Sequence, residues 1–191
     1  MRWDKLFDDL ESQLERELTA EELDLGAEEE RLRLSRLTMR DRLDAAPGAV
    51  LALTLVDGTR LAVRVVTVGR DWLSADVVDD STARRQAILP IAAIASVVLP
   101  REIVAASLAA RHEPHPALTA RLGLAFVLRD LCRRRRPVGL SVAGATLHGT
   151  IDRVGRDHFD LAIHEPGSAR RDSEVAEIRM VALAAVLMVR L

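Results

Sequence analysis

Hydrophobic residues near the start of the chain recur at helical spacing. An apolar stripe at separations of four, three and four residues consists of Trp3, Phe7, Leu10 and Leu14. Acidic residues fill most of the remaining positions, and residues 1–46 hold 14 acidic against 8 basic side chains. We therefore predict an acidic helical segment over residues 1–46, with breaks near Thr19 and Gly26. Its stripe is expected either to pack on the rest of the chain or to receive a protein partner.

Further along, hydrophobic residues alternate with polar or small ones over residues 47–100 and again over residues 137–191. Alternation of this kind predicts β-strands. The two stretches share a turn, since Val68-Gly69-Arg70-Asp71 recurs as Val154-Gly155-Arg156-Asp157. Each also holds a short apolar run before its last strand, Ile91-Ala92-Ala93 and Leu183-Ala184-Ala185. We predict an internal repeat that forms two small five-stranded barrels of the SH3 type.

The turn shared by the two stretches suggests a role for each of its residues. Gly69 is expected to adopt a positive φ, and Asp71 to accept hydrogen bonds from the amides of its own turn. In the second stretch, His148 and His164 are expected to approach each other across a hairpin. Such a pair is either a zinc or general-base site or two surface histidines.

Residues 101–136, between the two strand-rich stretches, read as a helical connector. From about Ala117 to Arg133 the apolar residues cover most of a helix circumference, which predicts a helix buried between the two barrels. Four consecutive arginines, Arg133 to Arg136, follow at its end. The chain is thus expected to be α+β, with an acidic helical segment (1–46), a first barrel (47–100), the connector (101–136) and a second barrel (137–191).

A helix followed by five strands, with an Asp-Gly turn and then a Gly-x-Asp turn, resembles the Sm-like fold. Val56-Asp57-Gly58 and Gly69-Arg70-Asp71 match the first motif of that family, and Gly155-Arg156-Asp157 matches it in part. The second family motif, an Arg-Gly or Lys-Gly pair, is replaced by Ala95-Ser96 and Leu187-Met188. The resemblance implies small barrels and an association with RNA.

Over nearly its whole length the sequence is also similar to a family of uncharacterised actinobacterial proteins. They open with Met-Arg-Trp-x-x-Leu-Phe-x-Asp-Leu-Glu and carry a Val-Gly-x-Asp-His-x-Asp-Leu-Ala run, here Val154 to Ala162. This resemblance implies no particular activity.

The composition and the missing motifs argue against several classes of protein. The net charge is −2, the only cysteine is Cys132, and no apolar run reaches the roughly 20 residues that span a bilayer. The acidic start lacks the apolar core of a signal peptide, so we expect a cytoplasmic protein that does not enter a membrane. The single lysine, Lys5, lies in the acidic segment and cannot complete a phosphate-binding loop, and no Gly-x-Ser-x-Gly elbow occurs. We expect neither an enzyme nor a bound cofactor or metal.

The connector holds the strongest candidate site. Residues 101–136 carry 8 arginines against 3 acidic residues, which forms a local basic patch in a nearly neutral protein. The arginine run either caps its helix in solvent or binds phosphate groups, and Arg70 and Arg156 extend the patch if both turns point toward it. Two hypotheses follow. The chain binds nucleic acid, chiefly RNA, through these arginines, or it is a protein-interaction adaptor that uses the acidic helix or a barrel edge.

Overall fold

The structure is a computed structural model that describes residues 13–14, 22, 24–79, 85–109, 118–168 and 171–191. Its contacts divide the chain into two units, Met1–Thr38 and Met39–Leu191. The boundary therefore falls before the end of the acidic segment predicted over residues 1–46. Of the helices in the described ranges, none is both long and apolar enough to cross a membrane.

In the first unit, residues 24–35 are helical without interruption. The break expected near Gly26 is wrong, because the neighbouring Leu, Ala and Glu residues are strong helix formers that offset the cost of one glycine, about 1 kcal/mol. Ion pairs one turn apart, Arg31 with Glu28 and Arg33 with Glu30, add support on the exposed surface. The break predicted near Thr19 lies outside the described residues.

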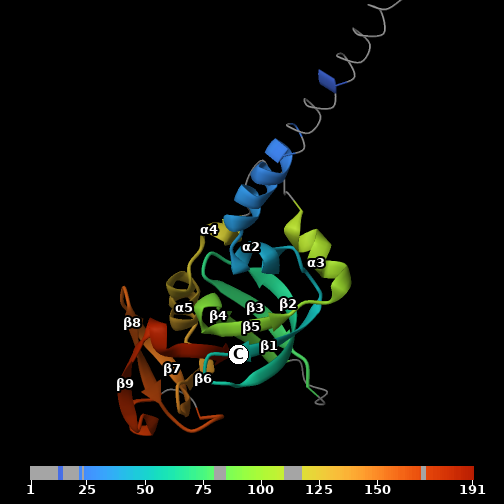
Figure 1. Cartoon of the computed structure of the whole chain (residues 1–191). Coiled ribbons are helices and arrows are strands. Elements are labelled where there is room, and N and C mark those ends of the chain that lie inside the picture. The colour runs from blue at the N-terminus through green and yellow to red at the C-terminus, as the bar shows by residue number, and fades with distance from the viewer. Residues whose placement is uncertain (1–12, 15–21, 23, 80–84, 110–117, 169–170) are drawn as a thin grey trace, which may run out of the picture. The chain divides into compact units, whose positions relative to one another are not determined.

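The second unit is α+β and is built on one open antiparallel sheet of ten strands, in the order β5-β1-β2-β3-β4-β10-β6-β7-β8-β9 (Figure 1). The strands are β1 (Val50–Leu55), β2 (Arg60–Val68), β3 (Trp72–Val77), β4 (Arg85–Pro90), β5 (Ile94–Val98), β6 (Pro137–Val142), β7 (Ala145–Val154), β8 (His158–Ile163), β9 (Glu177–Ala182) and β10 (Val186–Arg190). The helices are α2 (Met39–Asp44), α3 (Arg101–Leu108), α4 (Leu118–Arg121) and α5 (Leu124–Arg133), with 3-10 turns η1 (Ile91–Ala93), η2 (Asp172–Glu174) and η3 (Leu183–Ala185).

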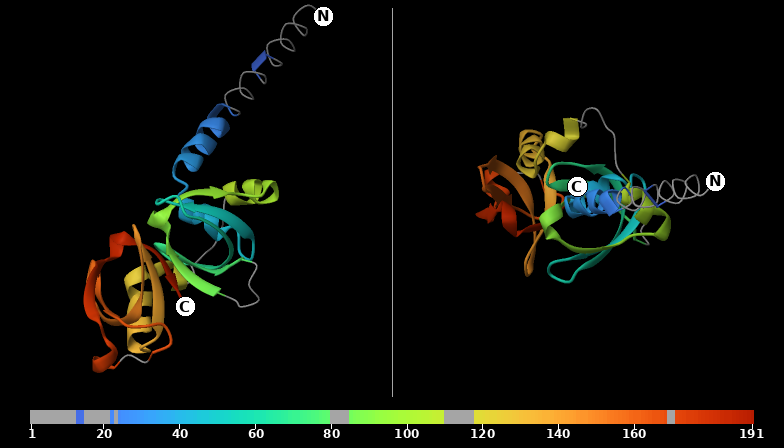
Figure 2. Two further views of the ribbon diagram at one scale, coloured as in Figure 1. Left: turned by 90° about the horizontal axis from the view of Figure 1, so that it is seen from below. Right: turned by 45° about the horizontal axis from the view of Figure 1, so that its top comes forward.

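The sheet consists of two halves with the same internal strand order. We call β5-β1-β2-β3-β4 the first half and β10-β6-β7-β8-β9 the second half. They join where β4 pairs with β10, so the last strand of the chain is the strand of the second half that borders the first half (Figures 1 and 2). A 3-10 turn precedes the final strand of each half and coincides with the apolar run that the two stretches share.

Alternating burial along the strands builds one apolar core under each half. In β1 every second side chain, Leu51, Leu53 and Leu55, is buried, as the sequence pattern predicts. The first core also includes Leu187 and Met188 of β10, which come from the second half. The second core includes Trp72 and Ile88 of the first half. Each half therefore contributes apolar side chains to the other, about 1.5–3 kcal/mol for each one fully buried.

The expected turn at Asp57-Gly58 forms, and the corresponding turn of the second half lies at Ala143-Gly144; both glycines have positive φ. Gly69, however, is not among the residues with positive φ, so the reason predicted for that glycine is wrong. Close approach explains it instead, because a Cβ atom at Gly69 would lie 2.3 Å from the indole ring of Trp72.

The second part of the connector, where one helix was predicted from about Ala117 to Arg133, forms α4 and α5, with Leu122 and Gly123 between them. Only one face of α5 is buried, through Leu124, Leu128 and Leu131, whereas Phe126 is 53% exposed. The prediction of a helix buried on most of its circumference is therefore wrong. The break at Gly123 shifts the phase of the apolar positions, so residues that fill one continuous helical wheel belong to two separate helices.

Candidate functional site

The arginine run forms the end of helix α5, which packs along strand β7 of the second half. The Arg136 amide donates to the Leu131 carbonyl at 3.2 Å, and the Arg135 amide donates to the Cys132 carbonyl at 3.0 Å. This pair of hydrogen bonds is the Schellman motif, which requires a left-handed residue and normally uses glycine for it. Here the left-handed residue is Arg135, with φ 49°. The chain thus keeps an arginine where the backbone favours glycine.

Asp130 organises the first two arginines of the run. Its carboxylate accepts hydrogen bonds from Arg133 and, at 2.7 Å, from Arg134. Desolvation opposes ionisation of Asp130, but its hydrogen bonds and charge interactions with both arginines outweigh this effect and hold the pKa of the carboxyl below its ordinary value. The arginine side chains remain 78% and 66% exposed, so they still present cationic groups to solvent.

The second turn, Val154 to Asp157, also contacts α5. Arg129 lies one turn before Arg133 on α5, and its guanidinium donates to the Gly155 carbonyl at 3.2 Å. Arg156, the next residue of that turn, is exposed. We call this group the arginine cluster: Arg129, Arg133, Arg134, Arg135, Arg136 and Arg156. Sequence reasoning had not assigned Arg129 to the site, although the Arg-Asp pair at 129–130 repeats the pair at 40–41 and offers a signal for it.

Arg70, in the first turn, lies at the opposite end of α5. Its guanidinium occupies the space beside Gly123, where an added Cβ would come within 2.3 Å of Nη2. Helix α5 has ten residues and is therefore about 15 Å long. The second turn contacts α5 through Arg129, midway along the helix, whereas Arg70 lies beside Gly123 at the start of the helix.

The first turn, Val68 to Asp71, is instead a joint between the first half and the start of α5. The Asp71 carboxylate accepts a hydrogen bond from the Leu124 amide at 2.7 Å, at the first residue of α5. The Leu122 carbonyl accepts from the indole of Trp72 at 2.9 Å and from the Arg70 amide at 3.1 Å. Asp71 was expected to bond to amides of its own turn. The carboxylate instead accepts from the Leu124 amide at the helix start, where the preceding residue, Gly123, has no side chain to cap it. It also accepts from the guanidinium of Arg70 at 3.4 Å.

Phe126 was expected to be buried with the rest of its helix and is exposed instead. It precedes Arg129 by three positions, so the two side chains share a face of α5. Among the described residues, Trp72 and Phe159 are buried, whereas Phe126 exposes 53% of its surface. The arginine cluster therefore has an exposed aromatic ring beside it.

The predicted approach of His148 and His164 is confirmed, with ring centroids 5.5 Å apart in an edge-to-face arrangement. His164 is buried, and its Nε2 and Nδ1 atoms lie 2.9 Å from Thr150 Oγ1 and 3.1 Å from the Glu165 carbonyl oxygen. Burial, and next the neighbouring His164, lower the pKa of His148, whose buried Nε2 has no hydrogen-bond partner. Across the described ranges, no group of three or more His, Cys, Asp or Glu residues is placed to hold a metal.

The remaining predicted site residues belong to the acidic segment. Leu14 is helical and 57% exposed. Trp3, Phe7 and Leu10 lie outside the described residues, so the apolar stripe stays a prediction.

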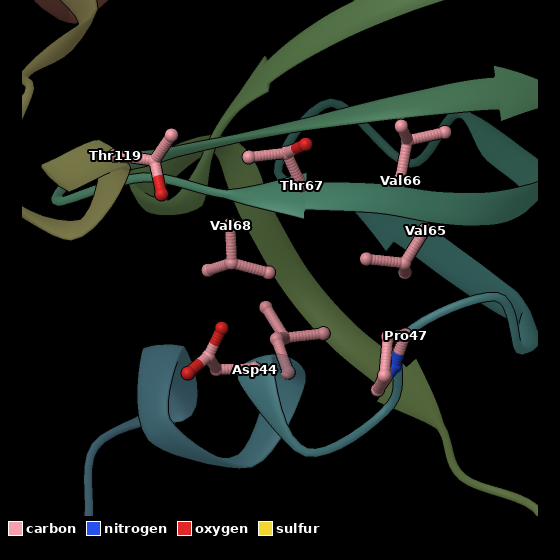
Figure 3. Close-up of a pocket in the computed structure, with 8 residues that line it drawn as sticks. Asp44, Pro47, Val65, Val66, Thr67, Val68 and Thr119 are labelled. Atoms are coloured by element: carbon pink, nitrogen blue, oxygen red, sulfur yellow. The ribbon is translucent and has the colours of Figure 1, made fainter. Parts of the chain in front are cut away.

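A small pocket lies between α2, the end of β2 and α4 (Figure 3). Its volume is about 180 Å³, and it is lined by Leu43, Asp44, Pro47, Val65, Val66, Thr67, Val68 and Thr119. Ligand sites of drug-sized molecules are typically ~300 Å³ or larger. This pocket is smaller, and it lies among elements other than α5, so we assign it no role in the candidate site.

No family model, curated protein or solved structure matches the chain.

Proposed function

We propose that this protein is a non-enzymatic RNA-associated protein that holds the phosphate backbone in its arginine cluster. We further propose that its two halves are tandem Sm-like barrels. The identical strand order of the halves and the 3-10 turn before each final strand support that relationship. The cytoplasmic location predicted from the sequence fits such a role.

The observation that carries the proposal is the left-handed arginine at the end of α5. A non-glycine residue in this conformation costs about 1 kcal/mol relative to glycine. Arg135 nonetheless occupies the position, between Arg134 and Arg136, which are both exposed. A solvated helix cap needs only one or two cations near the last carbonyls. A run that continues through the strained turn is better explained by a ligand that uses the guanidinium groups.

The chemistry of the cluster fits phosphate. Arginine presents planar, always charged donors that match phosphate oxygens in pairs. Within the cluster, only Arg133 and Arg134 share the carboxylate of Asp130, and that exposed pairing is weak enough for a phosphate to replace it. Phe126 beside Arg129 adds a surface on which an unpaired base can stack, which favours single-stranded RNA over a duplex.

A salt titration tests the proposal. The full chain would be titrated into labelled single-stranded RNA and duplex DNA at increasing salt, as wild type and with Arg133, Arg134, Arg135 and Arg136 replaced by Ala. The wild type should bind RNA with a slope of log K against log salt of about −0.7 per phosphate contact. The variant should bind more weakly and with a shallower slope.

A matched control removes the same number of exposed charges elsewhere, by alanine replacement of Arg31, Arg36, Arg60 and Arg85. It should retain the wild-type slope. Phe126→Leu should weaken binding of single-stranded RNA more than binding of the duplex. Absence of RNA binding by the wild type at low salt, where electrostatic attraction is strongest, would rule the proposal out.

A protein-interaction adaptor is the second candidate, and one observation favours it. Leu25 and Leu32, seven residues and about two turns apart on the acidic helix, are 65% and 52% exposed. Exposed leucines on one helix face suit a groove on a partner. Co-purification of a specific protein with the full chain, lost on deletion of residues 1–26, would support this function instead.

A further inference from the structure

The first turn binds a short backbone segment at the start of α5. The Arg70 amide and the Trp72 indole both donate to the Leu122 carbonyl, at 3.1 and 2.9 Å. The Asp71 carboxylate accepts from the Leu124 amide at 2.7 Å. The turn therefore holds a carbonyl and the amide two residues after it. Because all three hydrogen bonds go to backbone groups of that segment, the turn recognises the path of the backbone there.

Glycine at the middle of this segment allows the close approach. A Cβ atom added to Gly123 would lie 2.3 Å from Nη2 of Arg70 and 3.2 Å from Oδ2 of Asp71. It would displace the guanidinium and crowd the carboxylate that accepts the helix amide. The first turn is thus a receptor for three groups in order: a carbonyl, a glycine and the first amide of a helix.

The second turn carries the same groups. The residues that correspond to Arg70, Asp71 and Trp72 are Arg156, Asp157 and His158. The rings lie alike over the turn glycines, since a Cβ added to Gly69 would lie 2.3 Å from the indole nitrogen, and one added to Gly155 would lie 3.0 Å from Nε2 of the imidazole. In each half the 3-10 turn donates an amide to the aspartate carbonyl, at 2.9 Å from Ile91 and 2.8 Å from Leu183. The two turns therefore match in backbone and in ring position.

Within the chain, the second turn binds no such segment among the described residues. No atom in the described ranges accepts a hydrogen bond from the Arg156 amide. Asp157 pairs with the adjacent His158, and the two side chains are 86% and 45% exposed. A carboxylate offers about four acceptor sites, so this pairing leaves capacity for further hydrogen bonds. The donor and the acceptor that the first turn uses are both available in the second.

We propose that the second turn is a docking site for a partner protein, which it binds by the backbone as the first turn binds the connector. The partner segment has a carbonyl, then a glycine, then the first amide of a helix. The Arg156 amide donates to that carbonyl, and the Asp157 carboxylate accepts from that helix amide. A helix start suits the carboxylate, because its first amides lack partners within the helix and its dipole favours a negative charge.

This contact goes beyond RNA binding by the arginine cluster. It uses the backbone amide of Arg156, so the guanidinium of the same residue stays available to a phosphate. The Asp157 carboxylate accepts from an N–H donor but repels a phosphate group. An amide next to a carboxylate therefore suits a protein segment better than the backbone of RNA.

A peptide titration followed by NMR tests the proposal. The probe is a capped peptide with the sequence of residues 118–129 of this chain, which includes the segment that the first turn binds. Added to the isotope-labelled full chain, it should cause saturable shifts in the amide signals of residues 156–158. The amide signals of residues 70–72 should stay unchanged, because the chain's own segment occupies the first turn. The same peptide with Gly123→Ala should bind at least about fivefold more weakly, since its Cβ crowds the carboxylate.

Variants of the full chain separate the contributions of the two side chains. Asp157→Ala removes the acceptor and should weaken peptide binding about tenfold, whereas Asp157→Asn keeps one carbonyl oxygen and should weaken it less. His158→Trp supplies the indole N–H that the first turn uses and should strengthen binding. Glu165→Ala is the matched control, because it removes an exposed acid beyond the far end of β8. It should bind the peptide like the wild type.

Three results would overturn the proposal: no saturable shift in residues 156–158, equal binding of the glycine and alanine peptides, or unchanged binding in Asp157→Ala. A parallel titration with single-stranded RNA covers the other class of ligand. If RNA shifts the amides of Asp157 and His158 and the peptide does not, the turn belongs to the RNA site and the docking proposal is wrong. Peptide binding by a chain that binds no RNA would support the docking site and rule out the RNA site, so the two proposals fail separately.

Discussion

The two Val-Gly-Arg-Asp turns have the same sequence and the same internal hydrogen bonds but different surroundings. In each turn the glycine amide donates to the carbonyl three residues later, at 2.7 Å from Gly69 and 2.8 Å from Gly155. An arginine from the preceding helix, Arg40 or Arg129, donates to the glycine carbonyl in each case. The first turn then binds the start of α5, whereas the Asp157 side chain of the second is 86% exposed.

The difference shows that the local sequence determines the shape of the turn, while the segment that lies against it determines its role. The first turn contacts the start of α5 and holds that helix. Asp157 of the second turn pairs with the adjacent His158 instead, at 2.8 Å. The hydrogen bond from His158 lowers the pKa of Asp157. One turn is thus a structural joint, and the other is a surface beside the arginine cluster.

Substitution of the glycines of the two turns should give the largest difference in stability. Gly69→Ala would place a Cβ 2.3 Å from the ring of Trp72, which is buried and hydrogen-bonded, so it should destabilise the protein by about 2 kcal/mol or more. Gly155→Ala meets the ring of His158 at 2.8 Å, and that ring is the partly exposed end of its side chain, so the loss should stay below about 1 kcal/mol. Urea unfolding of both variants measures the difference. Equal losses of stability in the two variants would contradict the proposed difference between the turns.

Substitution of the two turn aspartates should give the next largest difference in stability. Asp71→Ala removes the acceptor for the Leu124 amide at the start of α5 and should cost about 1 kcal/mol, as for the loss of a helix cap. Asp157→Ala should change stability by less than about 0.5 kcal/mol, as is usual at an exposed position. The same unfolding assay applies, with Asp71→Asn as a variant that keeps one carbonyl acceptor. A larger loss from Asp157→Ala would contradict the assignment of the first turn as the joint.

The left-handed arginine at the C-terminal end of α5 allows a test of both stability and RNA affinity. Arg135→Gly relieves the left-handed strain and should raise the free energy of unfolding by about 0.5–1 kcal/mol. In the RNA titration the same variant should bind more weakly. If stability increases and RNA affinity is unchanged, the arginine at this position has no ligand role.

The smallest effect concerns pH and is expected only in the second half. In the alignment of the two halves, His148 and His164 correspond to Ala62 and Val78. The His164 amide donates to the His148 carbonyl, as the Val78 amide donates to the Ala62 carbonyl. The folded-state pKa of His148 lies below its ordinary value of 6.5, so the unfolded chain binds this proton more readily. The free energy of unfolding should therefore decrease as the pH falls from 6.5 toward the lower folded pKa. Thermal unfolding of His148→Ala should lack that part of the pH dependence, whereas an identical profile would exclude His148 as its source.

The sequence was sufficient to predict the strands and the turns between them. Alternation at Leu51, Leu53 and Leu55 marks a strand with one buried face, and Asp57-Gly58 marks its hairpin. The approach of His148 and His164 follows from the hairpin register. These features depend on neighbours along the chain or across one turn, which is the range that sequence periodicity reports.

Features that depend on distant segments escaped sequence analysis. The bond from the Leu124 amide to Asp71 joins residues 53 positions apart, and nothing near Asp71 indicates it. The exposed face of α5 was missed because the break at Gly123 hides the change of helical phase. The pairing of β4 with β10 joins the two sets of strands in one open sheet, and no local pattern separates that arrangement from two independent barrels.

The most direct test of this account compares RNA binding by Arg156→Ala and Arg70→Ala in one salt series. Arg156 lies in the exposed turn beside the arginine cluster, and Arg70 lies in the joint at the other end of α5. Arg156→Ala should weaken binding and make the salt slope shallower by roughly one phosphate contact, while Arg70→Ala should leave both unchanged. Equal losses in the two variants, or a loss only in Arg70→Ala, would contradict the claim that one turn is a joint and the other a binding surface.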